Sequence, residues 1–238
     1  MKNQYTADIT DYRTYGLLRV LCGQGGLSLG VNWMLTPNDG RSDGSKLAYL
    51  KDPATWRPYD SELFDAMARI IERDDRNVTA VENANLLPNT AFFSKLLPDT
   101  AEPRGRFMAQ ALDKLSDRDL LFLDPDNGME VASTPLGAKN SSKYLYFTEI
   151  SQAYDRGHSL IIFQYFPRVD RESYITRRAE ELRGATGSTA IYSLATSLVC
   201  FFVVARETHA PELAARLSIL SHQWGEQFTI SLYDPLGL

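Results

Sequence analysis

The sequence predicts an α/β fold: a single Rossmann-like, doubly wound and mostly parallel sheet with helices on both faces and an antiparallel C-terminal edge. The first observation is the short apolar run Leu120–Leu123, which is typical of a strand buried on both faces inside a parallel sheet. The second is the alternation of helix and strand patterns along the chain. The third is a pair of apolar runs, 189–194 and 198–206, whose short connection predicts an antiparallel hairpin.

In the first half of the chain, helix signals alternate with strand signals. Asp11 is a good N-cap for a helix that ends near Cys22. Asp60 would cap a second helix, in which apolar side chains recur at helical spacing from Leu63 to Ile71. We expect, in order, a helix at 11–22, a strand at 27–35, a polar turn-rich loop at 36–45, a helix from 60, a strand with its loop at 77–87, and a helix at 104–115.

The second half continues the alternation beyond the strand at 120–123. Gly157 is placed to end one helix, and Gly184 with Gly187 to end the next. We expect a helix at 142–154, a strand at 159–166, a charged helix at 170–183, strands at 189–194 and 198–206, a helix at 208–222, and a strand at 227–233.

Composition is that of an ordinary folded protein, with 44% apolar and 23% charged residues. The length, together with the lack of repeats or a linker, predicts one domain spanning residues 1–238. No stretch approaches the roughly 18 consecutive apolar residues of a membrane span, so we expect no membrane association. The N-terminus lacks the apolar core of a secretory signal, which predicts a cytoplasmic protein. Cys22 and Cys200 lie in apolar segments and are expected to be packed thiols.

Charge and motifs exclude several function classes. The formal net charge of −5 provides no general attraction for phosphate backbones. The arginines between 168 and 183 alternate with acidic residues, which favours a solvated helix face. The three histidines lack metal-ligand spacing, so no metal site is predicted, and their order along the chain suggests no Ser-His-Asp arrangement. A phosphate-binding Gly-Lys-Ser/Thr loop is absent, which argues against an ATP-driven function.

The strongest candidate site is the polar turn that follows the strand at 120–123. Asp124, Pro125, Asp126 and Asn127 come directly after the strand, and Glu130 follows shortly. Ligands of open α/β sheets bind just beyond the carboxyl ends of the strands, so these side chains are predicted to form a site. Carboxylates this close repel each other, and we expect a partner cation or a raised pKa among them.

This region resembles the class I S-adenosylmethionine-dependent methyltransferases, most clearly from 119 to 166. In the amino-methylating members, a similar strand runs into an Asp-Pro-Pro-Tyr motif, and the fold ends in a helix and an antiparallel strand pair. The resemblance implies that Asp124 accepts a hydrogen bond from the amine to be methylated and that the carbonyl of Pro125 contacts the same group. Asp126 stands in place of the second proline, and Asn127 replaces the aromatic residue that would stack on a flipped base. Tyr144 or Tyr146 could supply such a ring.

A second likeness lies at the N-terminus. The segment from Asp8 resembles the Ala-Asp-Val-Leu-Lys-His helix that opens a family of ribosomal RNA adenine methyltransferases, with Arg13 in place of the lysine. The glycine-rich loop of these enzymes has no counterpart after the strand at 27–35. The resemblance implies S-adenosylmethionine as cofactor, with four candidate contacts: Thr36 and Asp39 in the first loop, and Glu82 and Asn83 after the following strand.

Three functions are compatible with these observations. The favoured one is a methyltransferase that acts on an amine or base, for which a nucleic acid or nucleotide would be a suitable substrate. An alternative is a Mg²⁺-dependent nuclease or hydrolase, in which Asp124, Asp126 and Glu130 bind the metal and Lys139 or Lys143 assists phosphodiester attack. The third is a non-catalytic binding protein of the same fold, consistent with the missing glycine-rich loop.

Overall fold

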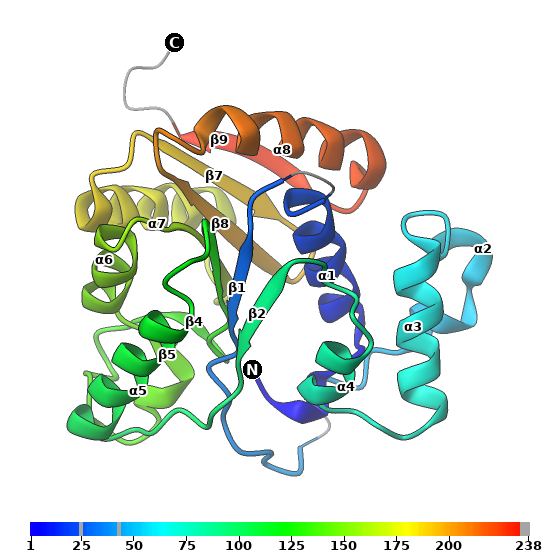
Figure 1. Cartoon of the computed structure of the whole chain (residues 1–238), viewed down its shortest axis with the longest axis horizontal. Coiled ribbons are helices and arrows are strands. Elements are labelled where there is room, and N and C mark those ends of the chain that lie inside the picture. Colours follow the sequence, from blue (N-terminus) through cyan, green and yellow to red (C-terminus); the bar gives the residue numbers. More distant parts are fainter. Residues whose placement is uncertain (24–25, 42–43, 234–238) are drawn as a thin grey trace.

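The computed structural model describes residues 1–23, 26–41 and 44–233 and contains a seven-stranded mixed sheet flanked by helices (Figure 1). The strand order is β2-β1-β3-β6-β8-β7-β9. The first four strands in this order are parallel, and β8 runs antiparallel to β6 and β7. The strands are β1 (Leu29–Asn32), β2 (Thr90–Phe93), β3 (Leu120–Leu123), β6 (Ser159–Tyr165), β7 (Ala190–Ala195), β8 (Val199–Ala205) and β9 (Thr229–Tyr233). The α/β, doubly wound fold class is confirmed.

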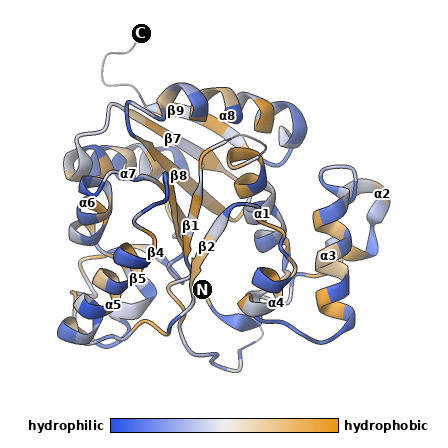
Figure 2. Cartoon of the chain, viewed as in Figure 1, coloured by the Kyte–Doolittle hydropathy of each residue, from blue (hydrophilic) through white to orange (hydrophobic). Residues whose placement is uncertain are grey.

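Helices cover both faces of the sheet. Alternate side chains of β3 point to opposite faces, so that Leu120 and Phe122 enter one apolar core while Leu121 and Leu123 enter the other. The strands are apolar and the outer sides of the helices are polar (Figure 2). The first core is covered by α1 (Ile9–Leu21), α3 (Ser61–Glu72), α4 (Val78–Asn83) and α8 (Ala210–Trp224), and the second by α5 (Ala101–Lys114), α6 (Phe147–Asp155) and α7 (Arg171–Thr186).

Short elements complete the fold. A small parallel sheet pairs β4 with β5 directly after the acidic turn. The remaining pieces are η1 (Asn3–Tyr5), η2 (Ala48–Lys51), α2 (Pro53–Trp56), η3 (Ser141–Lys143), β4 (Gly128–Met129) and β5 (Tyr144–Leu145). In the described part of the chain, no helix is long and apolar enough to cross a membrane.

Of the two helix caps predicted from the sequence, Asp60 is confirmed and Asp11 is wrong. Asp60 accepts the Leu63 amide at the start of α3, as predicted. Asp170 accepts the Ser173 amide at the start of α7, a cap that the sequence analysis did not assign. The first helix begins earlier than expected, because Asp8 and not Asp11 caps it. Asp11 then lies inside the first turn of α1.

The largest error of the sequence prediction concerns residues 77–87. This segment is the helix α4, because the Asn77 side chain accepts the Ala80 amide and starts a helical turn. The strand that pairs with β1 is instead β2, at residues 90–93. The helix expected at 142–154 begins only at Phe147, because Tyr144 and Leu145 pair with β4. In the predicted loop at 36–45, residues 42–43 lie outside the described residues.

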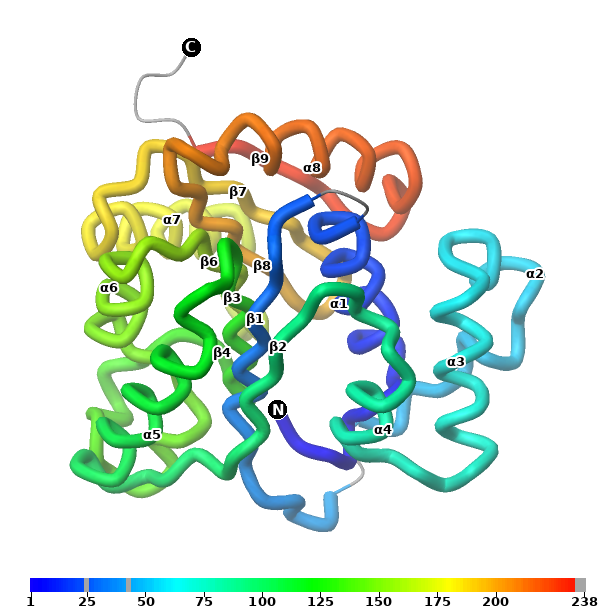
Figure 3. Tube along the Cα trace, viewed as in Figure 1, coloured from blue at the N-terminus to red at the C-terminus, as the bar shows by residue number. Residues whose placement is uncertain are grey.

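The β7–β8 hairpin is confirmed, and it has a specific place in the sheet. After α7 the chain forms β7 away from β6, and β8 then turns back into the space between them. The N-terminal segment runs from α1 back to the carboxyl ends of the central strands (Figure 3). Residues far apart in sequence therefore meet at this edge.

Candidate functional site

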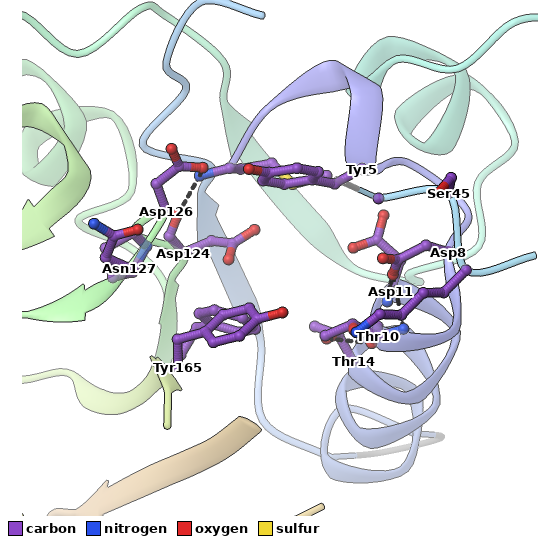
Figure 4. Close-up of a pocket in the computed structure, with 15 residues that line it drawn as sticks. Tyr5, Asp8, Thr10, Asp11, Thr14, Ser45, Asp124, Asp126, Asn127 and Tyr165 are labelled. Carbon is purple, nitrogen blue, oxygen red and sulfur yellow. Dashed lines mark hydrogen bonds and ion pairs between the residues drawn. The ribbon is translucent and has the colours of Figure 1, made fainter. Parts of the chain in front are cut away.

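A cavity of about 380 Å³ lies at the carboxyl ends of β3 and β6, facing the first turn of α1 (Figure 4). Its lining comes from the N-terminal segment, α1, residues 44–46, the turn after β3, and the end of β6. The predicted site residues Asp124, Pro125, Asp126 and Asn127 all line it. The acidic turn is thus part of a cavity and not a simple surface bend.

Backbone pairing and one buried side chain hold the turn in place. The Asp124 amide donates to the carbonyl of Asn32 on β1 at 3.2 Å. The Gln164 side chain on β6 accepts the Met129 amide at 2.9 Å and donates to the carbonyl of Asn127 at 3.3 Å. Gly128, at φ 113°, leaves the room that this amide group occupies. The turn after β3 is therefore clamped against β6.

Asp124 is the central acidic group of the cavity. Asp124 is only 7% exposed, and its carboxylate points into the open space of the cavity (Figure 4). Its backbone carbonyl accepts a hydrogen bond from the Met1 amine at 2.8 Å, but its carboxylate receives none from the described residues. Burial raises the pKa of Asp124 to about 7; the Met1 amine opposes the rise, and the charges of Asp126 and Asp8 add to it.

Asp126 has the cation partner that the sequence predicted one carboxylate would need. Lys2 Nζ lies 2.7 Å from its Oδ2, and the Thr36 hydroxyl donates to the same oxygen at 3.2 Å. The other oxygen, Oδ1, receives no hydrogen bond from the described residues, and the Met1 amine is 3.8 Å away. Lys2 also pairs with Asp39 at 3.2 Å. Two carboxylates close together in sequence thus have different electrostatic surroundings.

Two further carboxylates, which the sequence analysis did not assign to the site, form the opposite wall. Asp8 accepts the amides of Thr10 and Asp11 as the cap of α1. Asp11 accepts the Ala7 amide at 3.1 Å and the Tyr15 hydroxyl at 2.9 Å. Burial, followed by the charges of Asp8 and Asp124, raises the pKa of Asp11 well above its ordinary value. The cavity therefore brings four acidic side chains together.

The aromatic residues that line the cavity are Tyr5, Phe163 and Tyr165, not the rings expected after the turn. Tyr146 is buried elsewhere, with its ring 4.9 Å from the Arg104 guanidinium and its hydroxyl donating to Thr134. Tyr144 does not line the cavity either. Tyr165 was detectable from sequence, because it ends the strand beside β3 and parallel strand ends share one edge.

The four predicted cofactor contacts separate into two places. Thr36 and Asp39 lie beside the turn, linked to Asp126 directly and through Lys2. Glu82 and Asn83 lie on α4 instead of at a strand end, and none of the four residues lines the cavity. The Glu82 carboxylate accepts hydrogen bonds from the Trp33 indole, at 2.8 Å, and from Ser94.

The structure does not assemble the magnesium triad of the alternative hypothesis. Glu130 lines a different pocket, beside Arg178, whose guanidinium donates to the Glu130 carbonyl. Lys139 and Lys143 do not line the cavity of Asp124. Within residues 1–23, 26–41 and 44–233, no group of three acidic, histidine or cysteine side chains is arranged to hold a metal ion.

A Ser-His-Asp arrangement, which the chain order did not suggest, occurs at the amino end of β6. Ser159 Oγ is 2.9 Å from His209 Nδ1, and His209 Nε2 is 3.8 Å from Asp119 Oδ1. Ser159 is fully buried and also accepts the Arg206 amide. A serine without solvent access cannot attack a substrate, so this group ties the ends of strands and helices together.

Comparison with known proteins leaves the function open. No model of a known protein family matches the chain, and no curated protein does. A crystal structure of protein LPL1258 from Legionella pneumophila strain Philadelphia 1, assigned to family DUF519, aligns with 96% of this chain and 96% of its own. The identity is 10% and the TM-score 0.46, too low to support an argument about function.

Proposed function

We propose that this chain is a methyltransferase-like α/β enzyme that uses S-adenosylmethionine to methylate an amine held beside Asp124. One observation carries the proposal. The Asp124 carboxylate is buried, receives no hydrogen bond from the described residues, and points into a cavity at the edge of the sheet where α/β enzymes bind their ligands. A carboxylate that faces a cavity and receives no donor from the chain is open to a ligand that supplies one.

The topology supports this proposal. In the C-terminal part of the chain, a hairpin inserts β8 between β6 and β7, in line with the antiparallel strand pair of the methyltransferase resemblance. The first turn of α1, which carries the second likeness, faces the turn after β3 across the cavity. Two weak similarities, separated by more than a hundred residues, thus meet at one site.

The cavity residues suit a positively charged cofactor. A volume of about 380 Å³ falls within the usual range of small-molecule sites. Bound S-adenosylmethionine would supply a methyl group on a cationic sulfur. We assign its contacts to Thr36 and Asp39, which lie beside Asp126. None of the four predicted contacts lines the cavity itself. Thr36 and Asp39 are kept because they are linked to the lining residue Asp126, whereas Glu82 and Asn83 lie on α4 and are left out of this assignment.

Asp124 is suited to hold the amine. With a pKa near 7, its carboxyl group can accept a proton from a bound amine and return it to solvent near neutral pH. The clamped turn keeps the carboxylate and the Pro125 carbonyl in a constant position, which aligns the nitrogen for attack.

Calorimetric titration with S-adenosylmethionine tests the proposal. We expect binding with a dissociation constant in the micromolar range, roughly −8 kcal/mol. Asp124→Asn should keep cofactor binding and slow methyl transfer by about 100-fold or more. Asp170→Asn, the same change at the cap of α7 outside the cavity, should affect neither. Absence of binding at about 1 mM cofactor would contradict the proposal.

One observation favours a second function, that of a non-catalytic binding protein of this fold. The end of β1 carries the buried Trp33, packed against Tyr15 and Phe92, where the resembled enzymes have glycines. A protein of this kind would bind a ligand in the cavity without the cofactor. The same titration separates the two functions.

A further inference from the structure

We propose that the acceptor of this cavity is a primary alkylammonium group at the end of a flexible chain, and not a nucleobase. This inference rests on the proposed function for the methyl transfer, but the recognition of the ammonium group stands on the cavity alone. Three features carry it: the charge of the lining, an alkylammonium that the chain itself binds beside the cavity, and the orientation of Asp124.

The lining carries an excess of negative charge. Four carboxylates line it, while its cationic groups are the exposed Lys46 and the Met1 amine. A substrate with phosphate groups would bring further negative charge toward these acids, whereas an ammonium group neutralises them. The four acidic residues are all buried: Asp8, Asp11, Asp124 and Asp126.

Lys2 shows how this region binds an alkylammonium group. Its Nζ donates to Asp126 at 2.7 Å and to the Tyr5 hydroxyl at 2.9 Å, pairs with Asp39 at 3.2 Å, and lies 5.0 Å from the centre of the Tyr5 ring. Burial would lower the pKa of Lys2, but the hydrogen bonds to Asp126 and Tyr5 raise it above the ordinary value. Carboxylates and a tyrosine therefore stabilise a buried ammonium group next to the cavity.

The Asp124 carboxylate is a similar acceptor for an ammonium group, but no group of the described chain donates to it. Its carboxylate is directed into the cavity between the wall formed by Asp8 and Asp11 and the ring of Tyr165 (Figure 4). No donor from the described residues reaches this carboxylate. An ammonium group entering the cavity would provide hydrogen bonds to Asp124 and meet aromatic surface on Tyr5 and Tyr165.

The methyl transfer balances for this acceptor. The ammonium loses a proton to the Asp124 carboxylate, which passes it to solvent. The nitrogen lone pair then forms a bond to the methyl carbon of the sulfonium donor while the carbon–sulfur bond breaks. The products are a secondary ammonium group and a neutral thioether, and one proton is released.

Binding of 1,5-diaminopentane, measured by calorimetry without any methyl donor, tests the inference. The neutral isostere 1,5-pentanediol and adenosine 5′-monophosphate serve as comparison ligands. We expect binding of the diamine only. Asp124→Asn and Asp8→Asn should each weaken it about tenfold, and asparagine at position 8 still caps α1. Asp170→Asn repeats the change at a cap outside the cavity and should leave the affinity unchanged.

A second comparison identifies the carrier of the ammonium group. Tighter binding of Nα-acetyl-lysine amide than of the diamine would assign the site to a lysine side chain, and the reverse order to a free polyamine. Because buried carboxyl groups must ionise to bind a cation, the heat of binding at pH 7 should vary with the ionisation enthalpy of the buffer.

Failure of the inference and failure of the proposed function give different results. Equal binding of the diol, or tighter binding of the nucleotide, would overturn the ammonium site even if the cofactor binds. Diamine binding that depends on Asp124 and Asp8, in a protein that does not bind S-adenosylmethionine, would support the ammonium site and refute the methyltransferase.

Discussion

Asp124 and Asp126 differ in their surroundings although one residue separates them. Asp126 pairs with Lys2, whereas Asp124 is directed into the cavity with a pKa raised to about 7. The sequence predicted that such a pair needs a partner cation or a raised pKa, and the structure contains both solutions. It could not predict that the cation is Lys2, because that contact spans more than a hundred residues.

Asp124→Asn should change how stability depends on pH. Because the folded pKa of about 7 lies above the ordinary 3.8, the folded protein holds a proton that the unfolded chain releases between these pH values. The carboxyl group therefore favours folding below about pH 4, and this contribution is lost as pH rises through 7. We expect the variant to exceed the wild type in unfolding free energy by up to about 4 kcal/mol at pH 8.

Urea unfolding of both proteins from pH 4 to pH 8 measures this difference. The charged groups that face Asp124 are Asp8, Asp11, Asp126 and the Met1 amine, and both proteins contain them. The two stabilities should agree within about 1 kcal/mol at pH 4. A difference that stays constant with pH would show that the carboxyl group does not titrate in this range.

Gly128→Ala should destabilise the turn of the site. Gly128 has φ 113°, and an added Cβ would lie 2.3 Å from Nε2 of the buried Gln164 side chain. Strained backbone together with a broken clamp should cost about 2–4 kcal/mol. Gly105→Ala is the control, because Gly105 lies within α5 with open space around it. That change should stabilise by about 0.5–1 kcal/mol, and thermal unfolding compares the two.

At the scale of elements, a buried ion pair joins α5 to α6. Arg104 on α5 contacts both oxygens of Glu149, at 2.6 and 2.9 Å, and donates to the carbonyls of Ser141 and Tyr144. Glu149 also accepts the Tyr146 amide at 3.0 Å. These bonds position the segment that forms β5. The strand β4, which directly follows the acidic turn, pairs with β5.

Removing one partner of this pair should cost much more than removing a surface pair. Arg104→Met would leave Glu149 buried without its cation, and we expect it to lower the free energy of unfolding by about 3–5 kcal/mol. The double change Arg104→Met with Glu149→Met should cost less than the sum of the single changes in urea unfolding. Arg156→Met breaks an exposed pair with Asp113 and should cost under about 1 kcal/mol. Additive single changes would argue against coupling.

Local signals predicted elements well where they were strong and failed where they were short. The helical spacing of apolar side chains and the Asp60 cap predicted the helix α3 correctly. The six-residue α4 was mistaken for a strand, because six residues are too few to show a clear hydrophobic period. The four-residue β2 went unnoticed, since a short half-buried edge strand differs little from a loop.

At the scale of the whole molecule, the cavity depends on packing around both faces of the sheet. Its walls come from the start of the chain, the loop before η2, and the ends of β3 and β6. Parallel pairing of β1, β3 and β6 brings the strand ends to one edge, and α1 closes the cavity from one face. The site therefore requires the complete fold.

Divalent cations should leave the stability nearly unchanged. In the described residues the carboxylates around the cavity do not form a metal-binding group, and Glu130 lies in another pocket. We expect about 5 mM Mg²⁺ or Mn²⁺ to shift the melting temperature by under about 1 °C, since a ligand that does not bind the folded state does not stabilise it. A larger shift that Asp124→Asn abolishes would revive the metal-dependent hydrolase.

The α/β alternation, the buried strand β3 and the acidic turn after it could be predicted from local sequence patterns. Each of these depends on residues within a few positions of one another, so hydrophobic period and turn chemistry suffice. The proximity of Asp8, Asp11 and Lys2 to Asp124 and Asp126 became visible only in the folded chain. These contacts arise from the summed packing of helices on a sheet, and no local preference of the chain encodes them.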